Sequence, residues 1–246
     1  MATVLITGVG RTVGIGAACA RTLAAAGWDI AMTCWRPYDR EFMPGSAESE
    51  PDDVLNEVRA QGVRAELIHA DLADVDAPRS LFDALHERLG PCDALVAAHC
   101  RDVAVPLLGT VAAEFDLHFA INARSVALLI QEFTRQLSAD DGRIVAFTSD
   151  ALADNVPYGV SKGALDRVIQ AAAVELGPRG IRANCINPGP TDTGWIDDEL
   201  RAELSRTTPL GRPGLPQEAA DLVAFLLSPE GAWITGQVLH SNGGFQ

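Results

Sequence analysis

Two residues in the second half of the chain have types and a spacing suited to proton transfer. Tyr158 and Lys162 are four positions apart, so on a helix they share one face, a turn from each other. Lys162 is the only lysine in the chain, and the other 18 of the 19 Lys and Arg positions are arginine. An ammonium group beside a phenol stabilises the phenolate and lets tyrosine give or take a proton near neutrality. The alternative is a helix with two ordinary surface side chains, because so short a motif recurs by chance.

A glycine-rich turn near the N-terminus indicates a phosphate site. Residues 7–16 (TGVGRTVGIG) lie between an apolar run, 4–7, and a helix-favouring run, 17–26. Glycines at a strand–helix junction let the backbone approach a pyrophosphate, which then lies at the helix N-terminus. This turn therefore predicts a dinucleotide site.

The end of the second apolar run bears on which dinucleotide binds. Residues 33–36 (TCWR) contain no carboxylate, and the next acidic side chain is Asp39. In dinucleotide sites an acidic residue here binds the ribose 2′-hydroxyl, whereas an arginine accommodates a 2′-phosphate. Arg36, helped by Arg11, therefore favours NADP(H) over NAD(H). The alternative is that Arg36 is a solvated loop charge.

Apolar runs alternate with helix-favouring runs along the whole chain. Continuous apolar strands separated by helices indicate a parallel sheet covered on both faces, so we expect one α/β domain over residues 1–246, a Rossmann-type doubly wound sheet of about seven strands. The Pro-, Gly- and Ser-rich acidic segment 37–53 is expected to be a surface loop. The expected strands are 4–7, 30–34, 63–69, 94–98, 143–148, 181–186 and 237–240, and the expected helices are 17–26, 54–61, 80–89, 112–137, 156–176 and 217–227.

With these motifs in place, the chain resembles the classical short-chain dehydrogenase/reductase family over nearly its full length. The family's motifs occur in the family's order, and the closest similarity is to NADP-dependent 3-oxoacyl-thioester (acyl-carrier-protein) reductases. The matching pieces are Thr7-Gly8 with Gly14-Ile15-Gly16, Asp71-Leu72, Asn122, Ser149, Tyr158 with Lys162, residues 187–193 (NPGPTDT), 234–237 (ITGQ) and Gly243-Gly244.

The resemblance implies a role for each matching residue. Tyr158 would protonate a carbonyl oxygen as hydride arrives from the nicotinamide, or deprotonate an alcohol in reverse, and Lys162 would lower the pKa of the phenol and bind the nicotinamide ribose. Ser149 would hold the substrate oxygen, and Asn122 would fix a water that links Lys162 to solvent. The implied cofactor-binding residues are Gly8, Arg11, Gly14, Ile15, Arg36, Asp71, Leu72, Ala98, Tyr158, Lys162, Pro188, Gly189, Thr191 and Thr193.

The chain departs from the family pattern in four places beside this site, one of which is the acidic segment 37–53 that borders the expected adenosine end. The glycine turn is two residues longer than usual, which leaves open which glycines contact phosphate. Residues 97–100 (AAHC) replace the usual Asn-Asn-Ala-Gly, and His99 is interpreted as a structural histidine in preference to a substrate contact. Ser149 lies only nine residues before Tyr158, so Thr148 is an alternative substrate clamp.

Composition limits the partners. The net charge is −14 without a basic run, which argues against nucleic acid, and no apolar stretch is long enough to span a membrane. Five scattered cysteines are expected to be reduced thiols of a cytoplasmic protein, with no metal site. The resemblance implies a homotetramer, or a dimer, formed through the long helices, and a small-molecule carbonyl or alcohol substrate under a lid at 193–212.

Three functions remain open at this stage. The first is an NADP(H)-dependent reductase of a ketone or 3-oxoacyl compound. The second is a nucleotide-binding sensor that has kept the fold and lost turnover, which the altered 97–100 motif favours and the intact Tyr158 and Lys162 oppose. The third is an NAD-dependent alcohol dehydrogenase.

Overall fold

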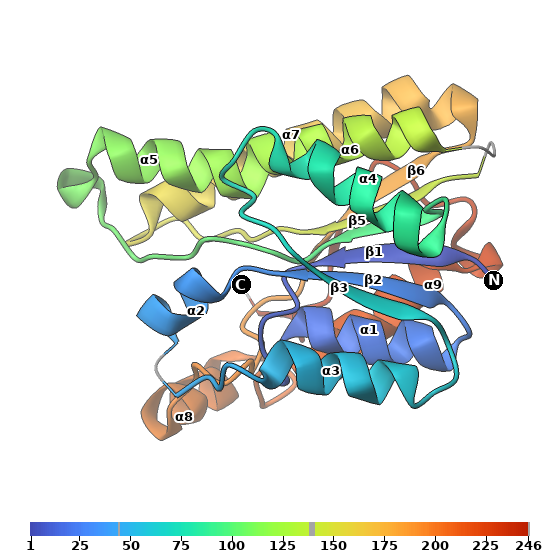
Figure 1. The fold of residues 1–246 in the computed structure, drawn as a ribbon. Coiled ribbons are helices and arrows are strands. Elements are labelled where there is room, and N and C mark those ends of the chain that lie inside the picture. Colours follow the sequence, from blue (N-terminus) through green and yellow to red (C-terminus); the bar gives the residue numbers. More distant parts are fainter. Residues whose placement is uncertain (44, 138–140, 246) are drawn as a thin grey trace.

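The computed structural model describes residues 1–43, 45–137 and 141–245, and its centre is one parallel sheet (Figure 1). Seven strands lie in the order β3-β2-β1-β4-β5-β6-β7, so the strand order reverses beside β1, between β1 and β4. This confirms the predicted Rossmann-type sheet. The strands are β1 Thr3–Thr7, β2 Asp29–Cys34, β3 Ala65–His69, β4 Ala94–Ala97, β5 Arg143–Phe147, β6 Arg182–Asn187 and β7 Val238–His240.

Helices cover both faces of the sheet. Figure 1 shows α1, α3 and α9 below it and α4 to α7 above it, while α2 and α8 lie beyond one end of the strands. Each face has its own hydrophobic core, as the continuous apolar strands require. The helices are α1 Ile15–Ala25, α2 Arg36–Phe42, α3 Glu50–Arg59, α4 Ala77–Leu89, α5 Ala112–Phe119, α6 Ser125–Gln136, α7 Val156–Leu176, α8 Asp198–Thr207 and α9 Pro216–Leu227.

Two local predictions need correction. The segment 37–53, expected to be a surface loop, is largely helical, because α2 covers Arg36–Phe42 and α3 begins at Glu50. The helix expected over 112–137 is interrupted by a π-helical turn at Ala120–Arg124, which separates α5 from α6. A π-helical turn inside a longer helix frequently marks a functional site.

Parallel pairing brings one end of every central strand to the same edge. Thr7 of β1 is paired with Ala97 of β4, and Cys34 of β2 with His69 of β3. In doubly wound sheets the crevice at this carboxyl edge, where the strand order reverses, is the usual ligand site. Within the described part of the chain, no helix has the length and apolar character needed to cross a membrane.

The first turn of α7 packs closely against the segment that follows β5. A Cβ atom added at Gly159 would clash with the carbonyl oxygen of Ala151, whereas a Cβ at Gly163, one turn further along the same helix, meets nothing within 4 Å. The residue after Tyr158 therefore has to be glycine if the loop is to lie this close to the helix.

We predict opposite effects of alanine at these two glycines. Gly159→Ala should lower the free energy of unfolding by about 1–3 kcal/mol, because the backbone of the loop must move. Gly163→Ala, the matched control, should raise it by up to about 1 kcal/mol through helix propensity. Thermal and urea unfolding of both variants checks this, and equal effects of the two substitutions would contradict the packing described here.

Candidate active site

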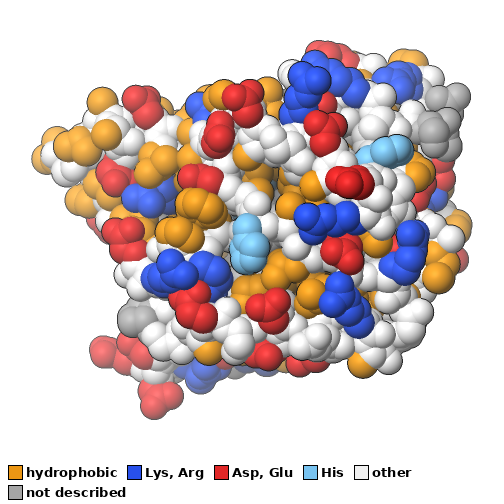
Figure 2. Space-filling model, in the orientation of Figure 1, with side chains coloured by type: hydrophobic (Ala, Val, Ile, Leu, Met, Phe, Trp, Pro, Cys, Tyr) orange, Lys and Arg blue, Asp and Glu red, His pale blue; other side chains and the backbone are white. Residues whose placement is uncertain are grey.

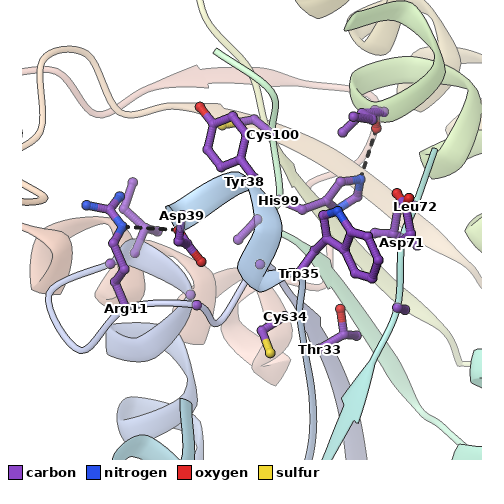
Figure 3. A pocket seen from close by; sticks show the side chains of 18 of the residues that line it. Arg11, Thr33, Cys34, Trp35, Tyr38, Asp39, Asp71, Leu72, His99 and Cys100 are labelled. Carbon is purple, nitrogen blue, oxygen red and sulfur yellow. Dashed lines mark hydrogen bonds and ion pairs between the residues drawn. The ribbon is translucent and has the colours of Figure 1, made fainter. Parts of the chain in front are cut away.

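A groove crosses the carboxyl edge of the sheet at the point where the strand order reverses (Figure 3). We call it the β1–β4 groove. Its walls come from the glycine turn, the ends of β2, β3 and β4, the π-helical turn and the segment after β6. The lining residues are Gly8, Gly10, Arg11, Gly14, Ile15, Gly16, Thr33, Cys34, Trp35, Tyr38, Asp39, Ala70, Asp71, Leu72, Ala98, His99, Cys100, Ile121 and Thr193.

The glycine turn forms the floor of this groove. Gly8 has a φ of 78°, and a Cβ there would lie 2.6 Å from the backbone of His99. A Cβ at Gly16 would lie 2.8 Å from the carbonyl oxygen of Gly8, so the turn folds back tightly onto the start of α1. Helix α1 has no side-chain cap, which leaves its first N–H groups for an anion. These features fit a dinucleotide pyrophosphate.

The structure places Arg36 behind the groove and not in its wall. The guanidinium is buried, with a 6% exposed residue surface, and donates to the carbonyl oxygens of Gly10 and Ala47 at 2.7 and 2.9 Å. It also donates to Asp39 Oδ2 at 3.1 Å. Arg36 thus ties the glycine turn to the segment between α2 and α3. It is neither the free phosphate reader nor the solvated charge that the sequence allowed.

Asp39 and Arg11 instead present their charges to the groove. Arg11 Nε lies 3.8 Å from Asp39 Oδ1, and Arg11 Nη1 donates to the carbonyl oxygen of Thr193 at 2.6 Å (Figure 3). Burial raises the pKa of Asp39, while Arg36 and Arg11 act in the opposite direction. Asp39 follows the end of β2 by five residues, and helix α2 turns it back to the groove.

His99 connects three elements beside the groove. Its Nδ1 lies 2.6 Å from Thr7 Oγ1, and its Nε2 lies 3.0 Å from the carbonyl oxygen of Ile121 and 2.8 Å from Ser125 Oγ. Because a carbonyl oxygen only accepts, Nε2 carries the proton and Nδ1 accepts from Thr7. Burial, helped by the charge of Lys162, lowers the pKa of His99 to about 3. The ring joins the end of β1 to the π-helical turn and to the start of α6, which supports the structural interpretation.

Tyr158 and Lys162 lie together on α7, as their spacing predicts. Lys162 Nζ is 5.7 Å from the centre of the Tyr158 ring and donates to the carbonyl oxygen of Phe147 at 2.7 Å. Burial raises the pKa of Tyr158 well above its ordinary value, Cys100 and Asp102 act in the same direction, and the Ser149 side chain lowers it. The direction of the Tyr158 pKa is thus opposite to the lowering expected from Lys162, and burial is its largest cause.

The hydroxyl groups of Thr148 and Ser149, which follow β5, are the two candidates for holding the substrate oxygen. Thr148 is buried, and its Oγ1 donates to the carbonyl oxygen of Lys162 at 3.3 Å, so it faces the backbone of α7. Ser149 is the one close enough to Tyr158 to affect its pKa. This placement favours Ser149.

Asn122 lies in the π-helical turn and joins it to α7. Its Nδ2 donates to the carbonyl oxygen of Arg101 at 2.8 Å and to Ser161 Oγ at 2.9 Å, and its Oδ1 accepts from the Arg101 N–H at 2.7 Å. Ser161 Oγ in turn donates to the carbonyl oxygen of Tyr158 at 2.7 Å. The Asn122 side chain thus holds the backbone around Tyr158.

The remaining expected cofactor residues divide into two groups. Those in the groove wall are Gly8, Arg11, Gly14, Ile15, Asp71, Leu72, Ala98 and Thr193, and those placed outside it are Arg36, Pro188, Gly189 and Thr191. The second group includes the turn after β6, where a Cβ at Gly189 would lie 2.5 Å from Asn242 Cβ. The groove also contains Trp35, Tyr38, Asp39 and Cys100, to which the sequence assigned no role. Tyr38 and Asp39 come from α2, so a helix recognised after β2 would have been the signal for these two.

The fold and the groove are those of a nucleotide-binding α/β protein with a tyrosine–lysine pair. Comparisons with known proteins identify its family. A short-chain dehydrogenase model described as enoyl-(acyl carrier protein) reductase matches residues 8–246. An uncharacterized oxidoreductase of Bacillus subtilis, YjdA, is 36% identical over 248 residues, covering 98% of this chain and 95% of that protein. An NADPH-dependent aldehyde reductase-like chloroplastic protein of Arabidopsis thaliana is 31% identical, covering 98% and 93%.

A solved structure agrees with the sequence matches. A short-chain dehydrogenase/reductase from Serratia marcescens superposes with a TM-score of 0.89 at 29% identity, covering 99% of this chain and 97% of that one. The chain belongs to the short-chain dehydrogenase/reductase family of oxidoreductases. Membership implies a nicotinamide cofactor, which the glycine turn and the adjoining groove fit.

We predict that His99 makes stability depend on pH in mildly acidic solution. With a folded-state pKa of about 3 against about 6.5 in the unfolded chain, protons bind the unfolded state first, so stability falls as the pH drops below about 6.5. His99→Gln should flatten the decrease in Tm between pH 7 and pH 4.5 relative to wild type, whereas the exposed control His86→Gln should not. An unchanged slope in His99→Gln would mean that His99 is not buried as a neutral ring.

Proposed function

We propose that the protein is an NADP(H)-dependent reductase that converts a ketone or 3-oxoacyl-type carbonyl into an alcohol. The observation that supports this most directly is the pairing of Tyr158 with Lys162 on α7, next to a dinucleotide-type groove. A phenol carries its proton at neutral pH, and the Lys162 ammonium, 5.7 Å from the centre of the Tyr158 ring, is placed to stabilise the phenolate that forms when this proton is given up. The NADPH-dependent aldehyde reductase-like relative points in the same direction.

In this mechanism each group of the chain has one task. The bound cofactor supplies the hydride that adds to the carbonyl carbon. Tyr158 donates its phenolic proton to the carbonyl oxygen, which leaves an alcohol and a phenolate. The Ser149 hydroxyl orients the same oxygen, and the Lys162 ammonium, fixed by the carbonyl oxygen of Phe147, stabilises the phenolate until a proton returns.

The proposed substrate is an apolar carbonyl compound. Exposed apolar side chains gather on the segment that runs from β4 to α5: Leu107 and Leu108 expose 69% and 100% of their surface, and Val111 exposes 58%. In Figure 2 hydrophobic side chains cluster at the end of the molecule where this segment lies in Figure 1. The segment reaches α7 through a hydrogen bond of 3.0 Å from the Val156 N–H to the carbonyl oxygen of Val105. We propose that 193–212, which contains α8, covers such a substrate.

The protein is further proposed to act as a homotetramer or dimer. A shallow hollow on α6 and α7 is lined mainly by small and apolar side chains, among them Ala127, Ile130, Val168 and Ala171. A symmetric copy of the same two helices is a suitable cover for this face.

The proposed reduction is tested by turnover of ketones and 3-oxoacyl thioesters with NADPH. Tyr158→Phe should lower kcat by at least about 10²-fold, because it removes the proton donor without changing the shape of the site. Lys162→Arg keeps a positive charge but not the compact amine, and should also lose most activity. The thermal stabilisation by NADPH should remain in Tyr158→Phe. Stabilisation by cofactor without turnover of any carbonyl compound in the wild type would instead favour the sensor function.

The choice of NADP(H) is supported by Arg11 in the groove and is opposed by the Asp39 carboxylate, while the donors of Arg36 are taken up by main-chain carbonyl groups and Asp39. Asp39→Asn should therefore strengthen binding of NADPH relative to NADH by about five- to tenfold, because it removes a negative charge next to the expected 2′-phosphate. Glu48→Gln is the matched control, since Glu48 pairs with Arg40 and Arg36 outside the groove. Dissociation constants from calorimetry check the ratio. Stronger NADH binding in the wild type, with no response to Asp39→Asn, would favour the NAD-dependent alternative.

A further inference from the structure

Helix α2 makes a direct contact across the β1–β4 groove. The Tyr38 hydroxyl donates to the carbonyl oxygen of Asp102 at 3.0 Å and accepts from the Asp102 N–H at 3.2 Å. Next to it, the guanidinium of Arg101 lies 5.2 Å from the centre of the Phe42 ring. Figure 3 shows Tyr38 reaching over the groove towards Cys100. The segment after β2 and the segment after β4 are therefore fastened to each other at residues 101–102.

The same Asp102 is connected to the beginning of the catalytic helix. Asn155, the residue before α7, donates from Nδ2 to Asp102 Oδ1 at 2.5 Å. Asn155 Oδ1 is buried and has no hydrogen-bond partner among the residues that the structure describes, so the contact with Asp102 is what orients this carboxamide. Tyr158 lies in the first turn of the helix that follows, three residues further along the chain.

From these contacts we propose that Tyr38 and Asp102 are positioning residues for Tyr158. Tyr38 fixes the backbone of Asp102, and the Asp102 carboxylate fixes Asn155, so that the segment at the adenosine end of the groove determines where the catalytic tyrosine stands. The proposal rests on the proposed function, because it assumes that Tyr158 is the proton donor. The proposal gives helix α2 a role in positioning Tyr158, which is separate from the roles proposed for Lys162 and Ser149.

The charge of Asp102 also acts on the pKa of Tyr158. The groups that face Tyr158 are Cys100 and Asp102 from the segment after β4, Tyr38 from α2, Ser149 from the segment after β5, and Lys162 from α7 itself. Asp102 is the acidic side chain of this set and disfavours the phenolate. Replacing it with a neutral residue should therefore lower the pKa of Tyr158, so that the rise of the oxidation rate with pH begins at a lower pH.

Kinetics of three substitutions test the positioning. Tyr38→Phe keeps the ring beside Phe42 and removes only the hydroxyl, Asp102→Ala removes the carboxylate, and Asp102→Asn keeps an acceptor for Asn155 without the charge. We expect kcat to fall about fivefold in Tyr38→Phe and in Asp102→Ala, with no further loss in the double variant, and to stay within about twofold in Asp102→Asn. The dissociation constant of the cofactor should change less than twofold throughout.

Several results would overturn the proposal. The first is an unchanged kcat in both Tyr38→Phe and Asp102→Ala. The second is a double variant in which the two losses of kcat multiply. The third is an equal loss of kcat in Asp102→Asn and Asp102→Ala, because the Asp102 carboxylate would then act only through its charge. Thermal unfolding confirms that each variant is folded.

A second measurement does not depend on a substrate. Since the chain has only two tyrosines, protein labelled with ¹³C at the tyrosine Cζ gives two signals, and Tyr38→Phe identifies that of Tyr158. In a pH titration both Asp102 variants should lower the pKa of Tyr158, and Asp102→Ala should also shift its signal at neutral pH. If the wild type transfers no hydride, the proposed function fails by itself. A Tyr158 signal and pKa that are unaffected in both Asp102 variants overturn the positioning proposal whether or not there is turnover.

Discussion

The hydrogen bond between Thr7 and His99 is the constraint on which the site depends. It joins the ends of β1 and β4 at the point where the strand order reverses, and it requires Gly8 to lie against the backbone of His99. The other side of the imidazole holds the π-helical turn through Ile121 and Ser125. The turn presents Asn122 to Ser161, and Ser161 holds the backbone of Tyr158. One imidazole ring thus connects the glycine turn at one end of the groove to the first turn of α7.

Arginine side chains have a structural role around this site that differs from phosphate binding. Arg36 is buried and directs its donors at main-chain carbonyl groups, and Arg11 reaches the carbonyl oxygen of Thr193. A planar guanidinium with five donors suits this bridging of loops, because several contacts are made by one rigid group. The charges around the groove are consequently paired, with Asp39 and Glu48 close to the guanidinium groups. Under the proposed function, the preference for NADP(H) or NAD(H) depends on how strongly the charges of Arg11 and Asp39 act on the 2′ position of the adenosine ribose.

The sequence predicted the elements whose cause is local and missed those whose cause is tertiary. Continuous apolar runs and the glycine turn were sufficient for the sheet and the groove, and a four-residue spacing was sufficient to bring Tyr158 beside Lys162. Helix α2 was missed because its composition is not helix-favouring, while its side chains are held by distant segments, Arg36 by the carbonyl oxygen of Gly10 and Tyr38 by that of Asp102. The π-helical turn depends on contacts of Asn122 with residues far along the chain. The direction of the Tyr158 pKa could not be predicted, since burial is a property of the fold.

The single lysine has a consequence for how this protein can be modified. Its ε-amine is buried, with a 2% exposed residue surface, and is held by the carbonyl oxygen of Phe147, while the other 18 of the 19 Lys and Arg positions are arginine. Acetylation, methylation or ubiquitination of a lysine side chain has no target here other than Lys162, beside the Tyr158 ring. A reagent that acts on lysine side chains therefore has one possible position of attack in this protein, and that position becomes accessible only if α7 moves away from the end of β5.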